Sequence, residues 1–152
     1  SYNEKGDLNF FVGRGFMPGS NKKLKPPFPQ SDIIPFEFYI NWNLPIILCE
    51  GVFDAITIKR NAIPLLGKII SKKLMKKIIS SSVQKIYIAL DKDAIKQSIE
   101  ISKHLLDEGK KVYLVDIENK DFSEMGFEQS IHLLQNTKPL TFSKLMEQKL
   151  LI

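Results

Sequence analysis

The feature that most constrains the fold is a fourfold alternation of short apolar runs and helix-period segments between Leu44 and Asn136. The apolar runs are 45–49, 62–66, 85–90 and 111–117, and the helical segments that follow them are 52–60, 71–80, 94–109 and 125–136. Strands that are apolar on both faces and joined by helices are typical of a parallel sheet covered on each side. The sequence therefore predicts an α/β fold with a central parallel sheet of about four strands flanked by helices.

The segments outside this alternation have a different character. Residues 1–43 are rich in Gly, Pro, Asn and aromatic residues, with a strand candidate at Asn9–Val12. We predict a small strand- and loop-rich lobe over 1–43, a catalytic domain over 44–136 and a closing helix or tail over 137–152. Within the domain, Asp93 is expected to cap the helix that runs to about Glu108, and Gly109 to end it in a left-handed conformation.

Composition excludes several classes of protein. The single cysteine, Cys49, rules out an internal disulfide framework and a cysteine-based zinc site. No apolar run approaches the roughly 20 residues that span a bilayer, so we expect no membrane partner and a cytoplasmic location. The 22 Lys and Arg residues exceed the 17 Asp and Glu residues, for a net charge of +5, which favours an acidic or phosphate-bearing partner.

Acidic residues follow three of the four predicted strands. They are Glu50 after the first strand, Asp91 and Asp93 after the third, and Asp116 and then Asp121 after the fourth. Asp54 lies one helical turn beyond Glu50 and is expected to point back over the same edge. Because the carboxyl ends of parallel strands form the working crevice of such a sheet, we expect these side chains to gather there. Asp116 is the weakest member, since it can simply begin a loop.

A cluster of like charges is costly unless cations occupy it, and carboxylate oxygens suit Mg²⁺ or Mn²⁺. The cluster therefore predicts a divalent metal site for phosphoryl or phosphodiester chemistry. The alternative for each residue is an ordinary acid at a helix N-terminus, where the helix dipole favours negative charge. The agreement of three strand ends favours the metal site.

Between the acidic segments, residues 55–90 contain no Asp or Glu. Lys72, Lys73 and Lys76 share a predicted helix there, whose basic face suits a phosphate backbone, although a solvated helix face is the alternative. Lys68, which follows Gly67 just past a strand end, is a candidate for holding a nucleotide phosphate. Lys120 has the same predicted role, and a plain surface lysine is the alternative for both. Arg14, between two glycines, is a further candidate for nucleic-acid contact, and the alternative is that it simply leaves a strand.

Together these motifs resemble the Toprim domain of bacterial- or phage-type DNA primases. CEGVFDAITI is similar to the first family motif, a strand ending in Glu-Gly with an Asp four residues after the Glu. ALDKDA is similar to the Asp-x-Asp motif, NAIPLLGK to the segment that ends in Leu-Gly before a helix, and NKDFSEMG to the acidic segment that distinguishes primases. The resemblance covers about Leu44 to Asn136, with fainter likeness around Arg14 and KPPFP.

The resemblance implies that the chain synthesises short RNA primers on a single-stranded DNA template from ribonucleoside triphosphates, with a replicative helicase as partner. The host would be a bacterial cell or a phage-infected one. Glu50, Asp91 and Asp93 would be catalytic, and Mg²⁺ or Mn²⁺ would be held by these three with Asp54 and Asp121. Gly51, Gly67, Lys68 and Lys120 would lie against nucleotide phosphates. Ser123 stands where many primases have a second acid or amide, which puts the metal role of this segment in doubt.

Two alternatives use the same residues differently. A Toprim nuclease, of the OLD or RNA-maturation type, would cleave phosphodiesters with the same acidic cluster. A non-catalytic Toprim remnant would bind nucleic acid without needing Mg²⁺ or Asp91. A topoisomerase is disfavoured, since the chain has no room for strand-gating domains.

Overall fold

The computed structural model describes residues 1–17, 19, 23–27, 29–117 and 121–150 of the 152-residue chain. Its strands are β1 (Gly13–Arg14), β2 (Lys23–Leu24), β3 (Ile46–Cys49), β4 (Ala62–Pro64), β5 (Lys85–Ala89) and β6 (Lys111–Leu114). Its α-helices are α1 (Val52–Ile58), α2 (Lys72–Ser80), α3 (Ile95–Asp107), α4 (Phe122–Asn136) and α5 (Phe142–Leu150). Three short 3₁₀ turns, η1 (Gln30–Asp32), η2 (Glu37–Tyr39) and η3 (Lys92–Ala94), complete the described elements.

The central sheet has four parallel strands in the order β4-β3-β5-β6, which confirms the predicted α/β class. The chain leaves β3 toward β4 on one side and then crosses to β5 on the other side of β3. Ligands bind open α/β sheets where successive connections diverge in this way, just beyond the strand ends. The register pairs Cys49 with Ala89, so the residues that follow β3 and β5 emerge side by side.

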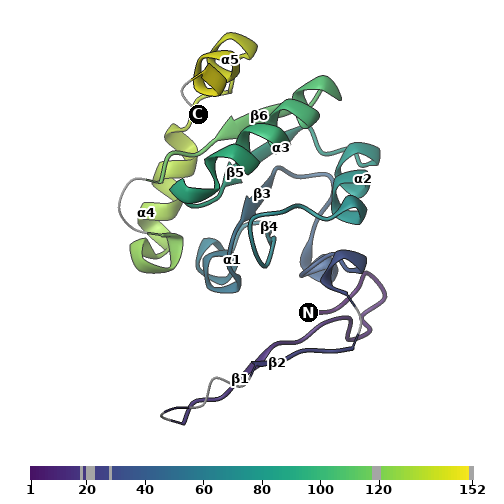
Figure 1. Cartoon of the computed structure of the whole chain (residues 1–152). Helices are drawn as coiled ribbons and strands as arrows, with labels where there is room; N and C mark the ends of the chain where they lie inside the picture. The colour runs from purple at the N-terminus through teal and green to yellow at the C-terminus, as the bar shows by residue number, and fades with distance from the viewer. Residues whose placement is uncertain (18, 20–22, 28, 118–120, 151–152) are drawn as a thin grey trace.

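Two apolar cores cover the two faces of the sheet, because successive strand residues point to opposite faces. Ile46 and Leu48 face the core made with helices α2, α3 and α5. Ile47 and Cys49 face the core made with α1 and α4. Figure 1 shows α3 and α2 on the near side of the sheet, with α1 and α4 next to each other. Burial on both faces explains why the strands read as continuous apolar runs.

Helix boundaries follow local chemistry, with one correction. Ser71 caps α2 by accepting a hydrogen bond from the Leu74 N–H, and Gly109 follows α3 with φ of 77°, as predicted. The prediction that Asp93 caps α3 was wrong, because the turn η3 separates the strand end from the helix. Ala94 occupies the N-cap without a side-chain bond, and Asp93 lies inside η3. Its carboxylate is thereby left for other contacts.

The N-terminal segment contains one long hairpin and a portion packed on the sheet. The two-residue strands β1 and β2 pair antiparallel partway along an arm that projects from the body (Figure 1). The predicted strand at Asn9–Val12 was wrong: Phe10 is buried, whereas Phe11 and Val12 are exposed, so the segment has no alternating buried face. Ile34 joins the core shared with α2 and α3, which fastens this segment to the sheet.

Two lysines of α2 also hold the N-terminal segment. Lys77 Nζ forms an ion pair with Glu4 at 3.1 Å, and Lys73 Nζ donates to the Asp32 carbonyl at 3.1 Å. Among the helices of the described ranges, none is both long and apolar enough to cross a bilayer.

Candidate functional site

Three carboxylates meet where β3 and β5 end, and we call Glu50, Asp91 and Asp93 the acidic triad. One carboxylate oxygen from each lies within 4.8 Å of the others. Glu50 follows β3 directly, Asp91 comes two residues after β5, and η3 turns Asp93 toward the same point. The neighbouring positions of β3 and β5 in the sheet therefore bring together residues that are far apart in sequence, as the strand pattern predicted.

Electrostatics in the triad disfavour full ionisation. Burial raises the pKa of Glu50, and the negative charge of Asp91 raises it further. Burial likewise raises the pKa of Asp91, with added repulsion from Asp54, Asp121 and Asp93. Glu50 Oε2 is buried and has no hydrogen-bond partner within the described part of the chain. Such an atom is costly unless a cation or a donor meets it.

Lys68 supplies a positive charge beside the triad. Its Nζ forms an ion pair with Asp93 Oδ2, and this contact is the main cause that raises the pKa of Lys68. The same charge opposes the pKa increase at Glu50 and Asp91. Lys68 reaches this position from the loop between β4 and α2, which also contains Gly67. Lys68 therefore lies next to the triad, and its predicted contact with a nucleotide phosphate stays a prediction.

The triad fits a divalent cation of the Mg²⁺ or Mn²⁺ kind. All its donors are carboxylate oxygens, which these hard cations prefer. The unpartnered Glu50 Oε2 is an acceptor that a cation would satisfy. Three carboxylates within this distance of one another outnumber the single lysine beside them, so an added positive charge relieves their repulsion.

Asp54 lies beside the triad but is used to join two helices. Its Oδ2 accepts from the Gly51 N–H and its Oδ1 accepts from the Ser123 N–H, both at 3.1 Å. Burial raises the pKa of Asp54, and these two N–H groups oppose the increase. Asp54 therefore fastens the start of α1 to the start of α4. The sequence held no signal for the contact with Ser123, because the two residues are 69 positions apart.

Asp121 is the N-cap of α4. Its Oδ1 accepts from the Glu124 N–H at 2.8 Å and from the Ser123 hydroxyl at 2.7 Å. For Asp54 and Asp121 the structure thus shows the helix-start role that the sequence left as the alternative. Neither belongs to the triad, although their charges raise the pKa of Asp91. Asp116 is exposed and also lies outside the triad.

Gly51 follows Glu50 directly and links it to Asp54, because its N–H donates to the Asp54 carboxylate. A Cβ at this position would lie 2.8 Å from Asp54 Oδ2, the atom that accepts from the Gly51 N–H. We expect Gly51→Ala to displace the Asp54 carboxylate and to lower the free energy of unfolding by about 1–3 kcal/mol, the usual cost of overpacking. Urea denaturation measures this. Gly19→Ala is no suitable control because φ is 80° there, so the control is Ser143→Ala on the exposed side of α5. An unchanged denaturation midpoint for Gly51→Ala would contradict the assigned contact.

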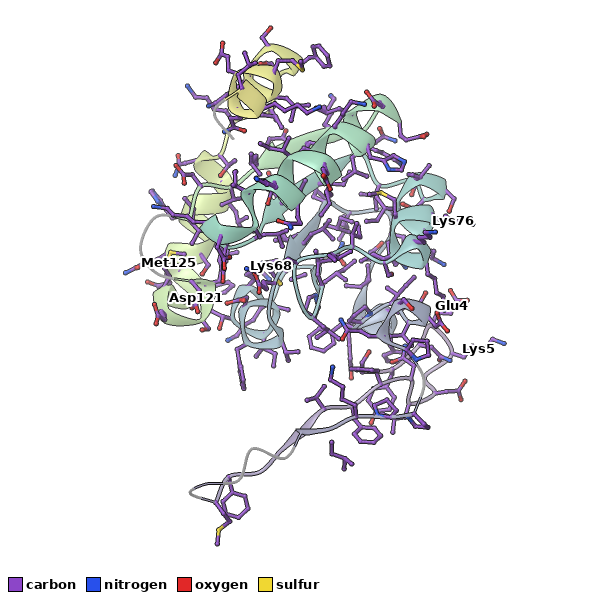
Figure 2. All side chains as sticks on the ribbon, viewed as in Figure 1. Glu4, Lys5, Lys68, Lys76, Asp121 and Met125 are labelled. Carbon is purple, nitrogen blue, oxygen red and sulfur yellow. The ribbon has the colours of Figure 1, made fainter. Side chains whose placement is uncertain are left out.

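Of the predicted phosphate and nucleic-acid residues, Gly51 and Lys68 lie at the triad, whereas those on α2 do not. Lys72 and Lys76 are exposed on α2, whereas Lys73 is used to hold the N-terminal segment. Figure 2 shows Lys76 near Glu4 and Lys5, well separated from Lys68 and Asp121. Arg14 lies in β1, and Lys120 lies outside the described residues. Contact of these residues with nucleic acid stays a prediction.

The raised pKa values predict how stability depends on pH without metal. The folded state favours the protonated forms of Glu50, Asp54 and Asp91, because their pKa values are raised there. Their contribution to the free energy of unfolding is therefore fully present at pH values below their ordinary pKa of about 4. It is lost as the pH rises through the raised values. In EDTA, we therefore expect the melting temperature of Asp91→Asn to rise relative to that of the native protein as the pH increases from 4 to 7. Mg²⁺ at pH 7 should stabilise the native protein more than the variant, and equal shifts would contradict a cation at Asp91.

Comparison with known proteins supports the fold. No protein family model matches the chain, and no curated protein sequence matches it. Among solved structures, the chain is similar to the Aquifex aeolicus primase, described as its zinc-binding and RNA polymerase domains. The TM-score is 0.70 at 24% sequence identity, and the alignment covers 91% of this chain but 39% of the other. The chain thus has a primase-like α/β fold and spans well under half of that structure.

Proposed function

We propose that this chain is the Toprim catalytic core, or part of it, of a bacterial- or phage-type DNA primase. The observation that carries the proposal is the acidic triad at the adjoining ends of β3 and β5, on a fold shared with a solved primase. In this proposal the chain joins ribonucleotides on single-stranded DNA, and the 3′ hydroxyl of one nucleotide attacks the α-phosphorus of the next. The new P–O bond replaces the bond to the leaving pyrophosphate.

The residues of the site have distinct roles in this proposal. Asp91 and Asp93 would hold Mg²⁺ or Mn²⁺, which supplies charge stabilisation for the phosphates when it is bound. Glu50 would act either as a third ligand of the metal or as the general base that takes the proton of the attacking hydroxyl. Lys68 holds the triphosphate of the incoming nucleotide after leaving Asp93. Asp54 positions Glu50 through Gly51.

The macromolecular partners belong to the same proposal. Exposed Lys72 and Lys76, with Arg14 and Lys120, would contact the phosphates of the template, which makes template binding weaker as salt increases. A replicative helicase would deliver the template. A protein of this kind works in the cytoplasm of a bacterium or of a phage-infected host.

The test is the synthesis of labelled oligoribonucleotides on single-stranded DNA with Mg²⁺ or Mn²⁺. We expect products that require all of template, nucleotides and metal. A parallel reaction without nucleotides measures cleavage of labelled DNA and RNA. Metal-dependent cleavage without synthesis would replace the proposal with a Toprim nuclease. Template binding that is indifferent to Mg²⁺, with neither reaction, would favour a non-catalytic remnant.

A further inference from the structure

A cavity lies beside the acidic triad, with Asp91 in its lining. Its volume is about 380 Å³, and it is bounded by the ends of β5 and β6, the start of α3 and helix α5. Cavities of this size are typical of small-molecule sites. Asp91 lines this cavity, whereas Glu50 and Asp93 do not. Most of the lining residues therefore lie outside the triad.

The lining offers three kinds of partner. Leu90, Ile117 and Leu140 give an apolar wall, and each is buried. Three exposed lysines, Lys92, Lys138 and Lys144, place positive charge around the cavity, while Asp116 is an exposed acceptor. An apolar wall with cations and a carboxylate suits a ligand that has a flat apolar part, an anionic part and hydroxyl or amine donors.

One oxygen atom in the lining lacks a hydrogen-bond donor among the described residues. Gln148 Oε1 is buried and has no hydrogen-bond partner within the described residues. Gln148 lies one turn beyond Lys144 on α5, and both residues line the cavity. A buried amide oxygen without a donor is unfavourable, and an N–H group of a ligand would satisfy it.

We infer that this cavity binds a nucleotide, at a site separate from the one where the acidic triad acts. The base lies against the apolar wall and donates an N–H to Gln148 Oε1. The sugar hydroxyls donate to Asp116, and the phosphate is held by the lysines. The inference goes beyond the proposed function, since neither the metal nor primer synthesis is needed for this binding.

The test measures binding of fluorescent and unlabelled adenosine and guanosine mono- and triphosphates in EDTA, by anisotropy and calorimetry. EDTA removes binding through a metal at the triad, so a failure of primer synthesis leaves this result unaffected. We expect saturable binding that Gln148→Leu weakens about five- to tenfold, as for loss of one hydrogen bond. Lys144→Gln should weaken it by a similar factor and reduce its salt dependence. Lys103→Gln on the exposed side of α3 is the matched control and should leave the affinity unchanged.

Several outcomes would overturn the inference. These are no saturable binding in the millimolar range, equal affinity for inorganic phosphate and nucleotides, or affinity unchanged in both Gln148→Leu and Lys144→Gln. Loss of binding in Lys68→Gln alone would instead place the nucleotide at the triad. Competition by a 5′-phosphorylated dinucleotide, at least as strong as by the free monophosphate, would support the site and identify the end of a strand as its ligand. Gln148→Leu replaces an unpaired buried amide with an apolar group, so it is expected to fold.

Discussion

Replacing Asp91 or Asp93 with Asn is expected to reduce primer synthesis on the order of 100- to 1000-fold, the range seen when one group that stabilises transition-state charge is removed. Each substitution removes one negative charge from the triad and leaves a side chain of the same size. The melting temperature in EDTA should stay the same or rise for Asp91→Asn, because burial and three neighbouring acids raise the pKa of the native carboxyl. Synthesis assays and melting curves on the same preparations measure both effects.

The matched control for this prediction is Asp107→Asn, at the far end of α3, where the carboxylate pairs with Lys103 on the surface. It should leave synthesis unchanged, since an exposed ion pair contributes little. Full activity in Asp91→Asn would remove the triad from the mechanism. A melting temperature that falls by many degrees would show that the carboxylates are structural.

The second large effect is expected on stability, from Asp54→Ala. The substitution leaves the Gly51 and Ser123 N–H groups without their acceptor, and each lost acceptor costs about 1–3 kcal/mol. Relief of the buried charge offsets part of this cost, so we expect a loss of about 2–4 kcal/mol in the free energy of unfolding at pH 7. Urea denaturation followed by circular dichroism measures it.

Asp121→Ala provides the comparison, because it removes an ordinary N-cap with an expected cost of about 1 kcal/mol. Asp54→Ala should also reduce activity, through the displaced Gly51 and Glu50. A stability loss under about 1 kcal/mol for Asp54→Ala, together with full loss of metal-dependent activity, would contradict the joining role. Asp54 would then be a metal ligand, as the sequence motif suggested.

The sheet was predictable from sequence because burial on both faces leaves an unmistakable apolar pattern at β3 and β5. The triad was predictable for the same reason, since parallel strands bring their following residues to one edge. The pairing of Asp54 with Ser123 was not, because backbone N–H groups carry no sequence signal. The N-cap of α3 was wrongly assigned to Asp93 because a 3₁₀ turn of three residues between β5 and α3 is invisible to helix periodicity.

The N-terminal segment was the least predictable part, since its structure depends on what it packs against. Phe10 and Ile34 are buried by the rest of the chain, and Glu4 is paired by a lysine of α2. Apolar residues such as Phe11 and Val12 look like strand residues in isolation but are exposed. Tertiary contacts, rather than local propensity, decided this region.

The contact between Asp54 and Ser123 also has a consequence for the order in which the protein folds. The triad needs the β3–β5 pairing, and the Asp54 carboxylate that accepts from the Gly51 N–H gains its second donor, the Ser123 N–H, only when α4 has docked on α1, which closes a loop across 69 positions. Long loops close late because their ordering entropy must be met before the contact stabilises them. Recovery of metal binding should therefore lag behind recovery of helical signal during refolding. A nascent chain that has not yet reached α4 would carry every triad carboxylate without the Ser123 N–H that holds Asp54 beside them.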